Sequence, residues 1–177
     1  MDHWITAAPL EVALKLTAGH TVRRHKAGVL LDTNLLLLLL AGSVDRKLIG
    51  NWKRTQTYDQ DDFDLLSDLL EPHRGLVVTP HIATEVSNLA TSLAKPDHEH
   101  FFRLFAGYLR DCEERTVAVR EVVVVDVFAR LGLTDTAIVR FKRRRPLVIT
   151  DDLPLALHLE RQRLPVVNFN HLRNLAA

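Results

Sequence analysis

Short apolar segments alternate with longer segments of helical periodicity along the chain. The apolar segments 27–31, 76–78, 147–150 and 166–168 have the length of short strands. Strands that are apolar throughout are typical of a parallel sheet covered on both faces, and the long segments between them can serve as the crossovers that parallel strands need. The pattern therefore predicts an α/β fold, a three-layer α/β/α sandwich with a central, mostly parallel sheet.

Several residues are typical of the first or last position of a helix. Thr79 is a good N-cap and Pro80 suits the first helical position, so a helix is expected directly after the strand 76–78. Further helices are predicted over 97–114 and 134–144. The segment 122–125 is rich in β-branched residues, but its continuation has helical spacing and favours a short helix.

The chain has 177 residues, of which 47% are apolar and 25% charged, as expected for one folded domain. The first predicted strand begins only after residue 27. An amphipathic stretch over 9–16 indicates a helix upstream of it. We therefore expect an N-terminal helical extension over 1–27 and one domain over 28–177.

The most apolar stretch, 35–44, contains six consecutive leucines. It is much shorter than the roughly 20 residues of a membrane-spanning helix, and Asp32 and Asn34 separate it from the apolar segment upstream. We interpret it as a buried core segment and expect no membrane segment. The single cysteine, Cys112, cannot form an intrachain disulfide. A reducing, cytoplasmic location is therefore predicted.

The charges are nearly balanced, with 23 basic and 22 acidic side chains and a formal net charge of +1. This balance excludes a polycationic protein that binds nucleic acid through its overall charge, so any nucleic-acid site must be local. Basic clusters lie at 23–26 and 142–145. A solvated surface is their simplest interpretation, and contact with an RNA backbone is the alternative. Arg140 and Arg143 follow Thr136 at helical steps and are candidates to flank a site.

Acidic residues follow the predicted strands, at the edge where open parallel sheets bind their ligands. Asp32 ends the first strand, Glu85 lies about two turns into the helix after the second, and Asp151 and Asp152 follow the third. Asp135 opens a predicted helix and joins the others if that helix begins at the same edge.

Each acid also has a purely structural interpretation. Asp135 can interact with the dipole of its helix, and Asp152 can cap the next one. Glu85 lies too deep in its helix to cap it, and Asp32 lies between apolar segments, so both carboxylates need a partner. A divalent cation is the simplest means of holding such acids together, and oxygen ligands favour Mg²⁺ or Mn²⁺. That cation can activate water and orient a phosphodiester.

Four segments resemble, in order, those of the PIN-domain nucleases, the family that includes the VapC toxins of bacterial toxin–antitoxin pairs. They are VLLDTN at 29–34, TPHIATEV at 79–86, GLTDTAI at 132–138 and VITDD at 148–152. The resemblance covers about residues 28–169. It implies a PIN-like fold and a Mg²⁺- or Mn²⁺-dependent endoribonuclease that hydrolyses phosphodiester bonds of single-stranded or structured RNA.

The resemblance also assigns the site residues. It implies that the catalytic and metal-binding acids are Asp32, Glu85, Asp135 and Asp152. The spacing Thr-x-Asp favours Asp152 as the fourth acid, with Asp151 as the alternative. Asn34 and Thr150 are expected to orient the acids or a metal-bound water.

The chain departs from the compact toxins in its length, in a long helical insertion after Glu85 and in its late first strand. A toxin role is therefore less well supported than the nuclease chemistry. Expected partners are RNA, a second copy of the chain in a homodimer, and an antitoxin or other regulatory protein, which the N-terminal helix could bind.

Two other functions compete with the nuclease. Haloacid-dehalogenase-like phosphatases also have an acid after the first strand and paired acids after a later one. Their first motif requires a second aspartate two residues after the nucleophile, where this chain has Asn34. A non-catalytic PIN-like scaffold that binds RNA or protein should have lost an acid, whereas all four positions are filled here.

Overall fold

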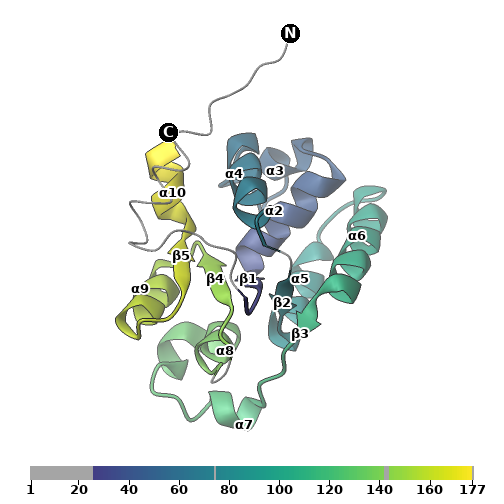
Figure 1. Ribbon diagram of the computed structural model, residues 1–177. Coiled ribbons are helices and arrows are strands. Elements are labelled where there is room, and N and C mark those ends of the chain that lie inside the picture. Colours follow the sequence, from purple (N-terminus) through teal and green to yellow (C-terminus); the bar gives the residue numbers. More distant parts are fainter. Residues whose placement is uncertain (1–25, 74, 142–143, 177) are drawn as a thin grey trace.

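A five-stranded sheet lies at the centre of the computed structural model, which describes residues 26–73, 75–141 and 144–176 (Figure 1). All neighbouring strands are parallel, in the order β3-β2-β1-β4-β5. The strands are β1 (Val29–Leu31), β2 (Leu76–Val78), β3 (Glu113–Glu114), β4 (Leu147–Thr150) and β5 (Val166–Asn168). The predicted α/β class and parallel sheet are confirmed.

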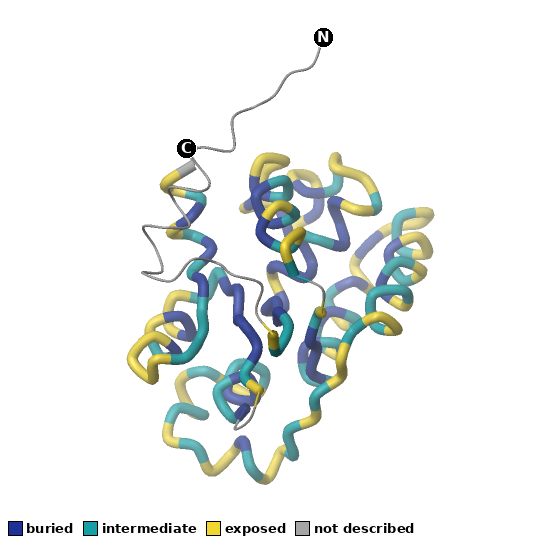
Figure 2. The backbone as a smooth tube through the Cα atoms, in the orientation of Figure 1, coloured by how far each residue is buried: buried dark blue, intermediate teal, exposed yellow. Residues whose placement is uncertain are grey.

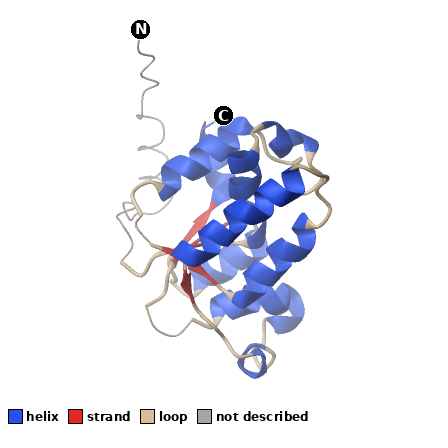
Figure 3. Ribbon diagram, turned by 90° about the vertical axis from the view of Figure 1, so that its right-hand side faces the viewer, coloured by secondary structure: helices blue, strands red, loops and turns tan. Residues whose placement is uncertain are grey.

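Helices surround this sheet and form two groups (Figures 1 and 3). The first group is α2 (Thr33–Val44), α3 (Lys47–Asn51), α4 (Gln60–Leu70), α5 (Pro80–Ala90) and α6 (Asp97–Asp111). The second is α7 (Val119–Val122), α8 (Phe128–Val139) and α9 (Leu153–Arg161), and α10 (Phe169–Ala176) follows β5. Helix α2 contacts every other helix of the first group, whereas α8 contacts both other helices of the second. The arrangement is compatible with a three-layer sandwich.

Three predicted boundaries differ from the structure. The helix expected over 97–114 ends at Asp111, because the next residues form the edge strand β3 beside β2. The helix expected over 134–144 is part of α8, which starts earlier and ends at Val139. Gly132 interrupts α8 with a φ of +73°, in the left-handed region that favours glycine. The short helix expected over 122–125 is not found there, because α7 ends at Val122 and residues 123–127 form turns before α8 begins at Phe128. The predicted helix 9–16 lies outside the described residues.

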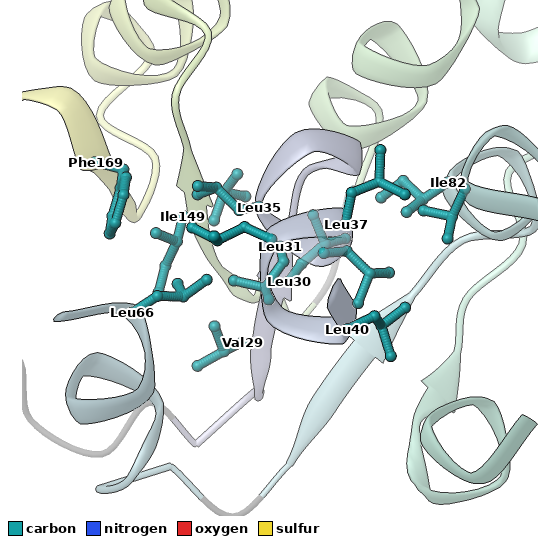
Figure 4. Close-up of a cluster of buried hydrophobic side chains, with 14 of the residues drawn as sticks. Val29, Leu30, Leu31, Leu35, Leu37, Leu40, Leu66, Ile82, Ile149 and Phe169 are labelled. Atoms are coloured by element: carbon teal, nitrogen blue, oxygen red, sulfur yellow. The ribbon is translucent and has the colours of Figure 1, made fainter. Parts of the chain in front are cut away.

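The leucine run forms half of α2, which packs against four other helices. Leu35 to Leu38 are fully buried, because side chains on all sides of this helix meet other elements. A helix that is apolar all round is expected in such a position. Figure 4 shows Leu35 and Leu37 close to Leu30 and Leu31 of β1, and Figure 2 shows the same buried interior along the backbone. None of the described helices is long and apolar enough to cross a membrane.

The strand order fixes where a ligand would bind. The strands that follow β1 along the chain lie first on one side of it, as β2 and β3, and then on the other, as β4 and β5. The order therefore reverses between β1 and β4, where Leu31 is paired with Ile149. Open α/β sheets bind ligands at the carboxyl ends of the strands at such a point. The residues that follow these strand ends are Asp32 and Asp151.

Candidate active site

Asp32 lies at the carboxyl end of β1 and is only 4% exposed. One carboxylate oxygen, Oδ1, accepts the N–H of Leu35 at 2.9 Å and caps α2, while Oδ2 accepts the N–H of Asp151 at 2.9 Å. Burial, followed by the negative charge of Asp151, raises the pKa of Asp32, although a hydrogen bond from Thr150 opposes the shift. The carboxylate is therefore fixed between the two central strands.

A cavity of about 230 Å³ opens beside Asp32 at this edge of the sheet. Four segments that are distant in sequence line it: Asp32, Thr33 and Asn34; Glu85; residues 131–135, including Asp135; and Asp152. The cavity thus brings together the four predicted acids and Asn34. No lysine or arginine is among the described residues that line it.

Glu85 reaches the cavity from α5, whose start is confirmed as predicted. The hydroxyl of Thr79 accepts the N–H of Ile82 at 3.1 Å, and Pro80 occupies the first turn. The Thr33 hydroxyl donates to Oε2 of Glu85 at 2.9 Å. This hydrogen bond supplies the partner that a carboxylate beside the apolar face of a helix requires.

Asp135 reaches the cavity because α8 bends at Gly132, so that residues on both sides of the bend face the same space. Burial raises the pKa of Asp135 to about 7, with further contributions from the charges of Asp152, Glu85 and Asp151. The sequence predicted that Asp135 would join the other acids only if its helix presented it at the same edge of the sheet. In the structure Asp135 lies at that edge, beside the other acids.

The adjacent residues Asp151 and Asp152 occupy different environments. Asp152 lines the cavity, and its Oδ1 also accepts the N–H of Leu155 at 2.6 Å to cap α9. Its own N–H donates to the hydroxyl of the fully buried Thr150 at 3.0 Å. Asp151 is not among the lining residues, and its carboxylate accepts hydrogen bonds from Asn34 at 3.2 Å and from the Tyr58 hydroxyl at 2.5 Å.

Of the two arginines expected to flank the site, Arg140 does not line the cavity. Arg140 lies at the end of α8, with its guanidinium 3.8 Å from a carboxylate oxygen of Glu121, and it is not a lining residue. Arg143 lies outside the described residues. A role of either arginine in RNA binding stays a prediction.

The residue types at the cavity are those that bind a hard divalent cation. Their side chains offer carboxylate and hydroxyl oxygens, and besides burial the negative charges of Asp152, Glu85 and Asp151 contribute to the raised pKa of Asp135. Within the described ranges, however, no three histidine, cysteine or acidic side chains form a group that could hold a metal ion. The predicted four-acid metal site therefore stays a prediction.

Three residues of the site were not found from the sequence. Thr33 holds Glu85, Tyr58 holds Asp151, and the Asn170 side chain donates to the Asp151 carbonyl oxygen at 2.7 Å. Two of them could have been recognised, because Thr33 follows the first acid and Asn170 lies just after the last strand. Tyr58 lies in a polar segment between α3 and α4 that carries no comparable signal.

Comparisons with known proteins place the chain in no family: no family model, no curated protein and no solved structure matches it.

Proposed function

We propose that this protein is a Mg²⁺- or Mn²⁺-dependent endoribonuclease with a PIN-like, three-layer fold. The observation that carries the proposal is the meeting of Asp32, Glu85, Asp135 and Asp152 at one cavity beside the point where the strand order reverses. These acids come from four segments in the order that the PIN-domain resemblance requires. An acidic cavity would repel an RNA phosphate unless a cation lay between them.

A divalent cation at this cavity would lower the pKa of a bound water and stabilise the charge that develops on the phosphate. Glu85 on α5, Asp135 on α8 and Asp152 at the N-cap of α9 all line the cavity. Thr33 fixes the orientation of Glu85. Asp32 accepts one backbone N–H at each oxygen and a further hydrogen bond from Thr150, which leaves part of the acceptor capacity of the carboxylate for another contact.

A haloacid-dehalogenase-like phosphatase is less well supported by the same geometry. The position of its second aspartate is occupied by Asn34, which donates to Asp151. A protein that only binds RNA or another protein would not need four acids around one cavity.

The biological setting belongs to the same proposal and rests on the resemblance. It comprises a cytoplasmic location, a homodimer, and an antitoxin or other regulatory protein as partner. Arg140 and Arg143 stay the candidates, from the sequence, for contact with the RNA phosphates.

Cleavage of an end-labelled single-stranded RNA by the purified protein tests the proposal, with Mn²⁺, Mg²⁺ or EDTA. Asp135→Asn, purified in parallel, removes one acid and reveals any contaminating nuclease. Asp68→Asn is a matched control, because Asp68 is exposed on α4 and does not line the cavity. We expect cleavage with either metal by the wild type and Asp68→Asn, and none with EDTA or by Asp135→Asn.

Cleavage that survives in EDTA, or that is equal in Asp135→Asn, would show that the acids do not form a metal-dependent nuclease site. Hydrolysis of p-nitrophenyl phosphate by a protein that leaves RNA intact would favour the phosphatase instead.

A further inference from the structure

Asp151 lies at the centre of a hydrogen-bond network beside the cavity. Its carboxylate accepts from the Tyr58 hydroxyl at 2.5 Å and from Asn34 at 3.2 Å. Its carbonyl oxygen accepts from Asn170 at 2.7 Å, and its N–H donates to Asp32 at 2.9 Å. The side chain and both backbone polar groups of Asp151 are therefore engaged, although the residue does not line the cavity.

Tyr58 acts on this network as a hydrogen-bond donor. It is only 5% exposed, and burial, followed by the charge of Asp151, raises the pKa of its hydroxyl. The hydroxyl therefore stays protonated at neutral pH, and its proton lies between the phenol oxygen and a carboxylate. This hydrogen bond stabilises the negative charge of Asp151, which lies beside the buried carboxylate of Asp32.

The ring of Tyr58 is itself held in place. The guanidinium of Arg173, on α10, lies 5.3 Å from the ring centroid. Arg173 also contacts the buried carboxylate of Asp62 on α4 at 2.5 Å and donates to the Thr57 carbonyl oxygen at 3.0 Å. Asp62 completes a capping box with Asp59 at the start of α4. Two helices outside the cavity thus fix the ring.

We infer that Tyr58 is a positioning residue that sets Asp32 and Asn34 at the cavity by holding Asp151. The inference rests on the proposed function and divides the roles of two adjacent acids. Asp152 faces the cavity directly, and Asp151 holds the carboxylate and the amide that flank it. Hydrogen bonds that orient a metal ligand affect metal affinity strongly even though they do not touch the metal.

The test compares Mn²⁺ affinity, measured by isothermal titration calorimetry, in the wild type and in two tyrosine variants. Tyr58→Phe removes the hydroxyl that donates to Asp151. Tyr108→Phe is a matched control, because the chain has two tyrosines and Tyr108 lies on α6 beside Cys112. We expect Tyr58→Phe to weaken Mn²⁺ binding about tenfold or more while its circular dichroism stays that of the wild type. Tyr108→Phe should bind Mn²⁺ as the wild type does.

A double-mutant cycle separates positioning from a general loss of stability. If Tyr58 acts through Asp151, Tyr58→Phe should change the affinity little further in a protein that already carries Asp151→Asn. A metal-free readout uses Tyr108→Phe as background, where Tyr58 is the remaining tyrosine. Its ultraviolet resonance Raman doublet, which reports hydrogen bonding of the phenol, should shift when Asp151→Asn is added.

The outcomes distinguish the inference from the function on which it rests. A wild type that binds no Mn²⁺ overturns both. A wild type that binds Mn²⁺ with a folded Tyr58→Phe of equal affinity overturns the positioning role alone, as does a Raman doublet that Asp151→Asn leaves unchanged. If Tyr58→Phe does not fold, the Raman doublet of Tyr58 in the Tyr108→Phe background decides. A shift on addition of Asp151→Asn supports the positioning role, and an unchanged doublet overturns it.

Discussion

At the residue scale, the acids of the cavity are also structural groups. Asp32 caps α2 and Asp152 caps α9, yet both line the same cavity. The sequence presents the cap and the ligand as alternatives for Asp152, but a carboxylate has enough lone pairs for both. Folding of the two helices therefore orients the side chains that the proposed chemistry needs.

Asp135 should make the stability of the metal-free protein depend on pH. Its pKa is raised to about 7 in the folded protein from the ordinary value of 3.8, so the folded state binds more protons between these values. The contribution of Asp135 to the free energy of unfolding is therefore most favourable below pH 4 and is lost as the pH rises through 7. Asp135→Asn should remove this loss.

Urea denaturation in EDTA at pH 5 and pH 8 measures the effect. The stability of Asp135→Asn relative to the wild type should rise by about 1–2 kcal/mol between the two pH values, a figure reduced for the partial exposure of the group. A relative stability that does not change with pH would contradict the assigned environment of Asp135. Asp68→Asn is the control, because its carboxylate is exposed.

Thr33 should control the metal affinity of the site through Glu85. Thr33→Val keeps the shape of the side chain but removes the hydroxyl that donates to Glu85 at 2.9 Å, and should weaken Mn²⁺ binding about tenfold. Thr33→Ser keeps the hydroxyl and should bind Mn²⁺ nearly as the wild type does. Calorimetric titration of both variants tests this, and equal affinities would show that the hydroxyl does not position Glu85.

At the element scale, the predictable features are those that depend on local sequence. The short apolar strands, the Thr79 cap and the buried leucine helix were all recognisable, because each has its own pattern of residues. The strand β3 was not, because Glu113–Glu114 is exposed and polar and pairs only through its backbone with β2. The kink at Gly132 joins two helical segments that sequence periodicity treats separately.

Helix α2 packs so closely against α4 that one glycine in it has no room for a side chain. A Cβ atom added at Gly42 would lie 2.2 Å from the ring of Phe63, whereas one added at Gly50, on α3, would meet nothing within 4 Å. Gly42→Ala should therefore lower the free energy of unfolding by about 1–3 kcal/mol through overpacking. Gly50→Ala should leave it unchanged or raise it by up to about 1 kcal/mol.

Chemical denaturation of the two glycine variants provides the comparison. A Gly42→Ala protein as stable as Gly50→Ala would mean that Phe63 moves aside at little cost. Helices α2 and α4 would then pack less tightly than described.

At the scale of the whole molecule, the site depends on contacts that no local pattern reveals. The hydrogen bond from Tyr58 to Asp151 joins residues 93 positions apart, and that from Thr33 to Glu85 joins residues 52 apart. The rule that parallel strands share a carboxyl edge predicted that Asp32, Glu85 and Asp151 or Asp152 lie near one another, since it follows from the topology alone. It left the contribution of Asp135 conditional on the direction of its helix. It could not predict Tyr58, which reaches the site from outside the sheet.

Helix α10 should contribute to stability through one side only. Leu172 is fully buried and Leu175 is 47% exposed on the same helix. Leu172→Ala should lower the free energy of unfolding by about 2–5 kcal/mol, and Leu175→Ala should change it by less than about 0.5 kcal/mol. Urea denaturation measures both, and similar losses would show that α10 is not docked as described.

The position of β1 between β2 and β4 also has a consequence for synthesis on the ribosome. Asp32 and Asp151 are separated by 119 positions, which take about 6–24 s to translate at about 5–20 residues per second. During that interval the nascent chain already contains β1 but lacks the strand that completes its second side, so an unpaired apolar edge is present. The acids of the cavity meet only once β4 has emerged. A nascent chain of the proposed nuclease therefore cannot cut RNA before most of it has been made.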